Sequence, residues 1–87
     1  MIVDLIRNDL GRVAKTASVR VDELFAVETY PTVHQMVSTV AAELRPGTAP
    51  SDLVAAMFPC GSVTGAPKFH AMEIVRELEI APRGLYC

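Results

Sequence analysis

The residues best suited to chemistry lie in the stretch FPCGSVTGAPKFHAMEIV, from Phe58 to Val75. Two glycines, two small hydroxyls, a proline and a lysine stand there just ahead of a helix-like run. Because a helix N-terminus presents unpaired backbone N–H groups, a glycine-rich approach to it can hold an anion. Gly61 and Gly65 would allow close backbone approach, while Ser62 and Thr64 would add hydroxyl donors. The same residues are also typical of a helix start that binds nothing, and both interpretations stay open at this point.

The stretch does not match the common phosphate-binding motifs. The interval from Gly61 to Gly65 is one residue too short for the GxxxxGK[ST] loop, and no Ser or Thr follows Lys68 to bind magnesium. Pro67 also lacks a backbone amide that a phosphate would need. Lys68 itself has two interpretations, a substrate contact or a solvated or ion-paired side chain at the helix entrance, and the second is favoured.

No other residues form a clear catalytic group. Two pairs of acidic residues are interpreted as solvated helix faces: Asp4 with Asp9, and Glu73 with Glu77. His34 is expected to be a packed, hydrogen-bonded strand residue, and His70 an exposed helix residue. Cys60 and Cys87 lie far apart without metal-ligand spacing, so they are predicted to be reduced, buried or half-buried thiols. A disulfide between them is possible but not required.

Composition excludes several classes of protein. Hydrophobic residues make up 51% of the 87 and the net charge is −2, so neither disorder nor a basic nucleic-acid surface is predicted. No apolar run approaches the roughly 20 residues that span a bilayer, and the charges among the first ten residues argue against a signal peptide. A cytoplasmic protein is the default expectation. A chain this short buries only about 60–65% of its unfolded surface.

The elements that must position the glycine stretch are helices and strands in mixed order. A helix is predicted at Met1–Leu10 with Gly11 just beyond its end, followed by strands at Ser18–Val21 and Leu24–Thr29. A longer strand is predicted at Thr32–Leu44, where neither face is clearly polar, so both faces are expected to be covered. This order is typical of an α+β fold.

The second half of the chain is predicted to be mainly helical. After a loop at 45–50, Ser51 is expected to cap a short helix at Asp52–Phe58. Pro67 is expected at the first position of the last helix, which the run RGLYC follows as a strand. Because the chain begins inside one amphipathic pattern and stops inside another, we expect residues 1–87 to be an internal segment of a single domain, truncated at both ends.

Four stretches together resemble consecutive motifs of the chorismate-utilising enzymes: MIVDLIRNDLGRVAKTASVRV, VETYPTVHQMVSTV, FPCGSVTGAPKFHAMEIVRELE and PRGLYC. The resemblance runs from end to end, except for the loop at 45–50. It implies part of the layered α/β sandwich of the chorismate-binding, anthranilate synthase component I-like fold. Within the family, GSVTGAPK and RGLYC are more similar to aminodeoxychorismate synthase component I than to the anthranilate synthase large subunit, which usually has GTxSGAPK.

The resemblance implies an enzyme that replaces a ring hydroxyl of chorismate with ammonia. A glutamine amidotransferase partner would deliver the ammonia, the product would be 4-amino-4-deoxychorismate for folate synthesis, and Mg²⁺ would be the cofactor. The resemblance places Gly61 and Ser62 at a substrate carboxylate, and Thr64 and Gly65 share the same stretch. Gln35 stands where anthranilate synthases and some relatives have an active-site histidine, so it is a substrate-binding candidate that cannot act as an acid or base. No role passes to His34.

This chain departs from the family pattern in a few places. Ala17 stands where the family commonly has glycine, which predicts strain if the turn needs a positive φ. Phe69 and His70 replace a usual aliphatic residue and arginine. No stretch here matches the family's magnesium-binding glutamates or its catalytic lysine, so the resemblance implies that this chain alone has no catalytic residue and no metal ligand, and is inactive. A segment of an anthranilate synthase and a free-standing, non-catalytic module are the alternatives.

Overall fold

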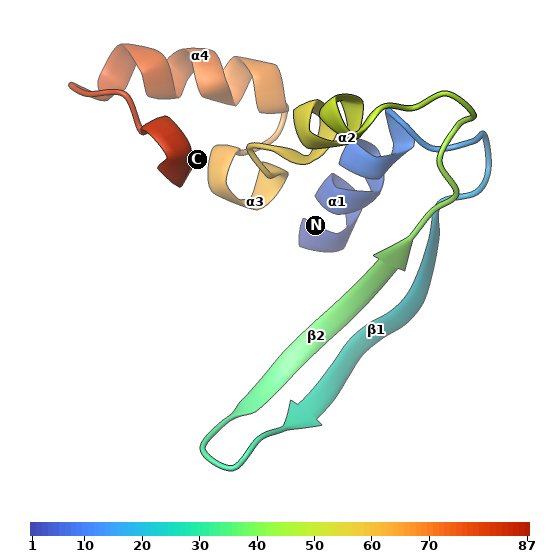
Figure 1. Cartoon of the computed structure of the whole chain (residues 1–87). Helices are drawn as coiled ribbons and strands as arrows, with labels where there is room; N and C mark the ends of the chain where they lie inside the picture. The colour runs from blue at the N-terminus through green and yellow to red at the C-terminus, as the bar shows by residue number, and fades with distance from the viewer.

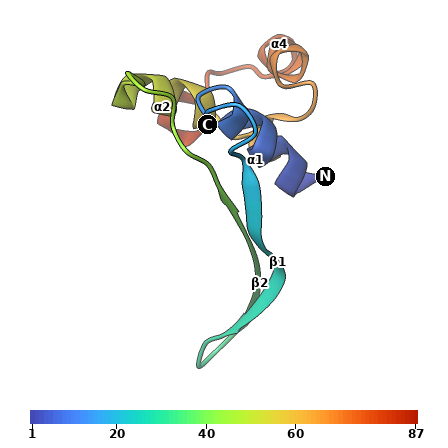
Figure 2. The ribbon, with the colours of Figure 1, turned by 90° about the vertical axis from the view of Figure 1, so that its right-hand side faces the viewer.

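The computed structural model describes all 87 residues, as a cluster of helices from which a long β-hairpin projects (Figure 1). Its helices are α1 (Ile2–Gly11), α2 (Pro50–Met57), α3 (Gly61–Thr64), α4 (Lys68–Leu78) and the 3₁₀ helix η1 (Gly84–Tyr86). Its strands are β1 (Arg20–Thr29) and β2 (His34–Ala41). A view turned by 90° shows the hairpin again pointing away from the helices (Figure 2). The predicted α+β class is confirmed.

The hairpin is antiparallel and irregular. Its register runs from Arg20 opposite Ala41 to Thr29 opposite His34, with two shifts inside β1. Phe25 lies at one of these irregularities with φ of 57°. The two predicted strands at Ser18–Val21 and Leu24–Thr29 are therefore one strand, because the polar residues between them are accommodated by bulges that bend the strand without ending it.

The second strand is shorter than predicted, eight residues at His34–Ala41 in place of Thr32–Leu44. Within these 87 residues neither face of this strand is covered: Met36 is 63% exposed on one face, and its neighbour Gln35, on the other face, is exposed as well. The prediction of two covered faces is thus wrong for this chain taken alone. The two-stranded sheet has no neighbouring strand and no helix layer against it.

The first two helices differ from the predictions at their ends. Gly11 is the last residue of α1, and Arg12 is its C-cap. Helix α2 begins at Pro50, so Ser51 lies inside its first turn and is not its cap. The N-terminus of α2 is closed by Asp52, whose Oδ2 accepts the Ala49 N–H at 2.9 Å. Pro50 has no N–H to lose at this position, which explains the earlier start.

The end of the chain is not a strand. After α4 the chain turns back, and Gly84, with φ of 60°, opens the short helix η1. The Arg83 guanidinium donates to the Glu79 carboxylate at 2.9 Å and to the Val63 carbonyl at 3.1 Å. These contacts hold the end of the chain beside α3 and α4, so a distant partner overrides the strand-like composition of RGLYC.

The core is very small. Only Val13, Ala14 and Ala56 are buried hydrophobic residues, and Asp9 and Gly61 are also buried. Helix α4 has no buried residue at all. None of the helices is long and apolar enough to cross a membrane. The cluster is therefore fixed by a few close contacts among α1, α2 and α3 and not by a large apolar interior.

Ala17 lies in the turn between α1 and β1. The Ser18 N–H donates to the Lys15 carbonyl at 3.1 Å, which makes Ala17 the third residue of a four-residue turn. Its φ is 61°, in the left-handed region that favours glycine. The positive φ on which the prediction of strain depended is confirmed.

Candidate functional site

Four of the five predicted substrate-binding residues lie together on one turn. Gly61, Ser62 and Thr64 belong to helix α3, and Gly65 is its C-cap. The predicted loop is thus a single helical turn, in which the Val63 N–H donates to the Cys60 carbonyl and the Gly65 N–H to the Gly61 carbonyl. Gly65 has φ of 125°, a conformation that L-residues rarely adopt.

Gln35 is not brought to this turn. It is the second residue of β2 and pairs with Glu28 at the end of the hairpin away from the helices (Figure 1). Its side chain is exposed, and its amide donates only to the carbonyl of Met36, at 3.4 Å. In this structure the glycine turn and Gln35 are separate features.

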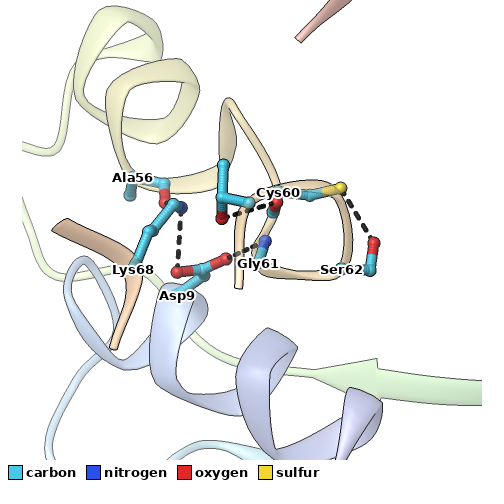
Figure 3. A network of polar contacts seen from close by, with 7 residues as sticks. Asp9, Ala56, Cys60, Gly61, Ser62 and Lys68 are labelled. Carbon is cyan, nitrogen blue, oxygen red and sulfur yellow. Dashed lines mark hydrogen bonds and ion pairs between the residues drawn. The ribbon is translucent and has the colours of Figure 1, made fainter. Parts of the chain in front are cut away.

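Gly61 is fixed by helix α1. Its N–H donates to Asp9 Oδ2 at 3.3 Å, in a buried contact between residues 52 positions apart (Figure 3). A Cβ atom at this position would lie 3.0 Å from the Cβ of Leu5, closer than nearly all real contacts of this kind. Any side chain at position 61 would force α1 and the turn apart by a few tenths of an ångström, so glycine suits this close approach. Because its N–H is already used by Asp9, Gly61 contributes shape here, and no free donor.

The buried Asp9 and the half-buried Lys68 form an ion pair. Lys68 Nζ lies 3.0 Å from Asp9 Oδ1, and the two side chains are 13% and 5% exposed. The same ammonium donates to the Ala56 carbonyl at 3.3 Å (Figure 3). The prediction of a solvated Asp9 is wrong, since its carboxylate lies inside the cluster. The favoured interpretation of Lys68 is a solvated or ion-paired side chain at the helix entrance, and the structure shows it ion-paired and half-buried.

A sequence signal for the burial of Asp9 does exist. Ile2, Leu5 and Asp9 follow one another at intervals of three and four, so Asp9 falls on the same face of α1 as the apolar residues. A charge at such a position is rarely left without a partner, because an unpaired buried charge is costly. The partner itself, 59 residues away, has no such signal.

The hydroxyls of the turn have different surroundings. Thr64 Oγ1 donates to the Cys60 carbonyl at 3.2 Å, so this hydroxyl stabilises the turn. Ser62 is exposed, and its Oγ lies 3.1 Å from the Cys60 sulfur. The hydrogen bond with Ser62 lowers the pKa of the Cys60 thiol, because a hydroxyl that donates to sulfur favours the thiolate. Of the two hydroxyls of α3, that of Thr64 is bonded to the backbone and that of Ser62 faces solvent.

The long helix begins later than predicted. Pro67 is the N-cap of α4 with extended backbone, and Lys68 is its first residue. The glycines therefore precede a single turn, and only after Pro67 does the eleven-residue helix start. A four-residue helix has a small dipole, so the anion interpretation depends on the hydroxyl and local amides more than on a helix macrodipole.

A cavity of about 410 Å³ lies beside Gly61 between α1 and the start of α4. Its lining includes Asn8, Arg12 and the Asp9–Lys68 pair. The Arg12 guanidinium stands 5.5 Å from the centre of the Phe69 ring, a cation–π contact across the cavity. Positively and negatively charged side chains thus line the same cavity.

The remaining predicted residues lie outside this cluster. His34 is exposed, so the expectation of packing is wrong, although its Nδ1 lies 3.2 Å from Thr29 Oγ1. His70, with Glu73, is exposed on α4 as predicted. Cys60 and Cys87 are free thiols of intermediate exposure, as predicted.

The residues present do not fit a magnesium ion. No group of three or more His, Cys, Asp or Glu side chains gathers in the structure. Asp9, the one buried carboxylate, is already neutralised by Lys68 and bonded to Gly61. A hard cation needs several oxygen ligands, so this chain alone offers no site for one.

The class of protein follows from comparison with known sequences. The family model described as chorismate binding enzyme matches residues 1–87, the whole chain. The chain therefore belongs to the chorismate binding enzyme family. Among solved structures, anthranilate synthase component I from Streptococcus pneumoniae TIGR4 superposes with a TM-score of 0.84 and 43% identity, over 99% of this chain and 20% of that one. This likeness supports the predicted chorismate-binding fold.

Individual relatives show which members of the family this chain resembles. Aminodeoxychorismate synthase component 1 of Klebsiella aerogenes is 59% identical over 87 residues, and that of Escherichia coli (strain K12) is 58% identical over 87 residues. Anthranilate synthase component 1 of Aquifex aeolicus is 54% identical over 86 residues. These three matches include 100%, 100% and 99% of this chain, but only 19%, 19% and 17% of the respective relatives. It spans about a fifth of the length of the curated relatives it matches.

Proposed function

We propose that this chain is a segment of an aminodeoxychorismate synthase component 1, which aminates chorismate to 4-amino-4-deoxychorismate. The observation that carries the proposal is the identity of 59% and 58% to two such components over all 87 residues. Residues 1–87 would form an internal part of one chorismate-binding domain. The exposed apolar faces of the hairpin support this, because an exposed apolar surface of this kind usually has a partner.

In this proposal the turn at Gly61–Gly65 binds a carboxylate of chorismate. Ser62 offers a solvent-facing hydroxyl on a turn whose backbone is fixed by Asp9. Gly61 allows the close approach of the turn to α1, and Thr64 and Gly65 hold its shape. Gln35 would meet substrate only if the rest of the domain brings the two features together. No catalytic residue is proposed within this chain.

The remaining parts of the proposed reaction lie outside the 87 residues. Ammonia would come from a glutamine amidotransferase subunit or domain, and Mg²⁺ would be held by residues of the longer enzyme, since no ligand set is available here. The product would serve folate synthesis in the cytoplasm. The chain by itself would be inactive.

An anthranilate synthase segment is the second candidate. The 54% identity to the Aquifex aeolicus component and the structural likeness to the Streptococcus pneumoniae component favour it. The two candidates share a substrate and differ in product: anthranilate formation releases pyruvate, whereas 4-amino-4-deoxychorismate keeps the enolpyruvyl group. Product identity therefore separates them.

The test is a chimera in which this chain replaces the matching residues of the Escherichia coli component, to which it is 58% identical. With chorismate, ammonia and Mg²⁺, we expect 4-amino-4-deoxychorismate, measured by liquid chromatography and mass spectrometry. A chimera carrying the matching Aquifex aeolicus segment is the control. A folded chimera that makes no product, or that makes anthranilate, would contradict the proposal. The 87-residue chain alone should make neither product.

A further inference from the structure

One ion pair connects all four α-helices of the cluster. Asp9 lies on α1 and Lys68 on α4, while their other partners are Gly61 on α3 and Ala56 on α2. Each helix therefore contributes one group to a connected network of three polar contacts around Asp9 and Lys68 (Figure 3). With only three buried hydrophobic residues in the chain, no large apolar core could fix these helices in its place.

The two oxygens of Asp9 have separate tasks. Oδ1 accepts from the Lys68 ammonium at 3.0 Å, and Oδ2 accepts from the Gly61 amide at 3.3 Å. The ammonium neutralises the carboxylate and so offsets the free-energy cost of burying it. The carboxylate in turn fixes the position of the Gly61 amide. The position of Gly61 determines that of Ser62, the next residue on the same turn.

We propose that Asp9 and Lys68 are positioning residues for the substrate-binding turn, an inference that rests on the proposed function of that turn. Neither side chain touches the substrate. Asp9 holds the amide of Gly61, and Lys68 holds the Asp9 carboxylate in place. Together they fix the turn that carries Ser62, whose hydroxyl exchanges its contact with Cys60 Sγ for the substrate carboxylate when substrate binds. Loss of this arrangement weakens binding in the ground and transition states alike, so KM should rise while kcat changes little.

The sharpest test compares two double variants of the chimera that have the same charge. Asp9→Asn with Lys68→Met removes both charges but keeps an oxygen that can accept the Gly61 N–H. Asp9→Ala with Lys68→Met removes both charges and that acceptor. We expect KM for chorismate to be about fivefold higher in the alanine variant than in the asparagine variant, the effect of one hydrogen bond. We expect kcat to differ by less than about twofold.

Glu77→Gln is the matched control, because Glu77 is an exposed carboxylate on α4, the helix that carries Lys68, and does not line the cavity beside Gly61. It should leave KM unchanged. If the alanine variant does not fold, Asp9→Glu decides, since it keeps the charge but displaces the carboxylate by one methylene, and we expect KM to rise about threefold or more. Equal KM values for the two double variants, or an unchanged KM for Asp9→Glu, would overturn the positioning role.

These outcomes are distinct from failure of the proposed function. If the unsubstituted chimera folds but makes no 4-amino-4-deoxychorismate, the proposed function fails first and the turn has no substrate to bind. If the unsubstituted chimera is active and the variants keep its KM, the proposed function stands and only the positioning role is wrong. Circular dichroism and thermal melting of every variant separate a change in KM from partial unfolding.

Discussion

Replacing Ala17 with glycine should stabilise the protein. Ala17 has φ of 61° at the third position of its turn, and a left-handed conformation costs a residue with a Cβ about 1–2 kcal/mol. Glycine removes this cost but loses about 0.5–1 kcal/mol through its greater freedom in the unfolded chain. Because Ala17 is exposed, no packing is lost. The net expectation is a gain of about 0.5–1 kcal/mol, measured as a higher urea midpoint of the chimera with an unchanged slope.

The control is Ala55→Gly on the exposed face of α2. Ala55 has helical backbone, so the same exchange there should destabilise by about 1 kcal/mol. Both exchanges remove the same methyl group from an exposed alanine. Opposite effects on stability would therefore result from the different sign of φ at the two positions. If Ala17→Gly lowered the midpoint as Ala55→Gly does, the turn would not impose a left-handed conformation on residue 17, and the account of this turn would be wrong.

Further predictions concern the turn of α3. Gly61→Ala should destabilise the protein by about 1–3 kcal/mol, because the new Cβ would lie 3.0 Å from a side chain of α1. Gly11→Ala is the control: its Cβ would meet nothing within 4 Å, so it should stabilise the protein by up to about 1 kcal/mol. The urea midpoint of each variant measures both effects. Since the hydroxyl of Ser62 lowers the pKa of the Cys60 thiol, the thiolate fraction at pH 7–8 is raised, and Ser62→Ala should slow iodoacetamide labelling of Cys60 there by about twofold to tenfold. The difference should vanish at a pH above both pKa values. Labelling of Cys87, measured by peptide mass spectrometry in the same samples, should not change, and an unaltered Cys60 rate would show that the Ser62 contact does not stabilise the thiolate.

Local features of this fold could be predicted from the sequence because their causes are local. The apolar spacing of the first ten residues predicts a helix at Met1–Leu10, and the structure has one at Ile2–Gly11. The glycines and hydroxyls of Gly61–Gly65 predict an irregular approach to a helix, and the structure has the single turn of α3 there, ahead of α4. Periodicity and turn chemistry depend on neighbours within a few residues, so one sequence suffices to reveal them.

The errors occur where distant partners decide the structure. The composition of RGLYC favours a strand, but Arg83 binds Glu79 and Val63, and these contacts hold the segment in a 3₁₀ turn. The long strand predicted at Thr32–Leu44 ends early because Leu44 leaves the hairpin to form an isolated bridge with Ala14. Glu79 is only four residues from Arg83, but Val63 is 20 residues from Arg83, and Ala14 is likewise far from Leu44 in the sequence. A pattern of period two or 3.6 does not reveal these two distant partners.

Asp9 shows how far such reasoning can be extended. Its place on the apolar face of α1 is visible in the sequence, and a buried carboxylate requires a cation or several donors. The chain has eight lysines and arginines, so this requirement alone does not select Lys68. What selects it is the approach of the glycine turn to Leu5, which brings the start of α4 over the end of α1. The glycine at position 61 therefore acts twice: it allows the turn to meet α1, and it brings to Asp9 both the amide and the ammonium that its burial requires.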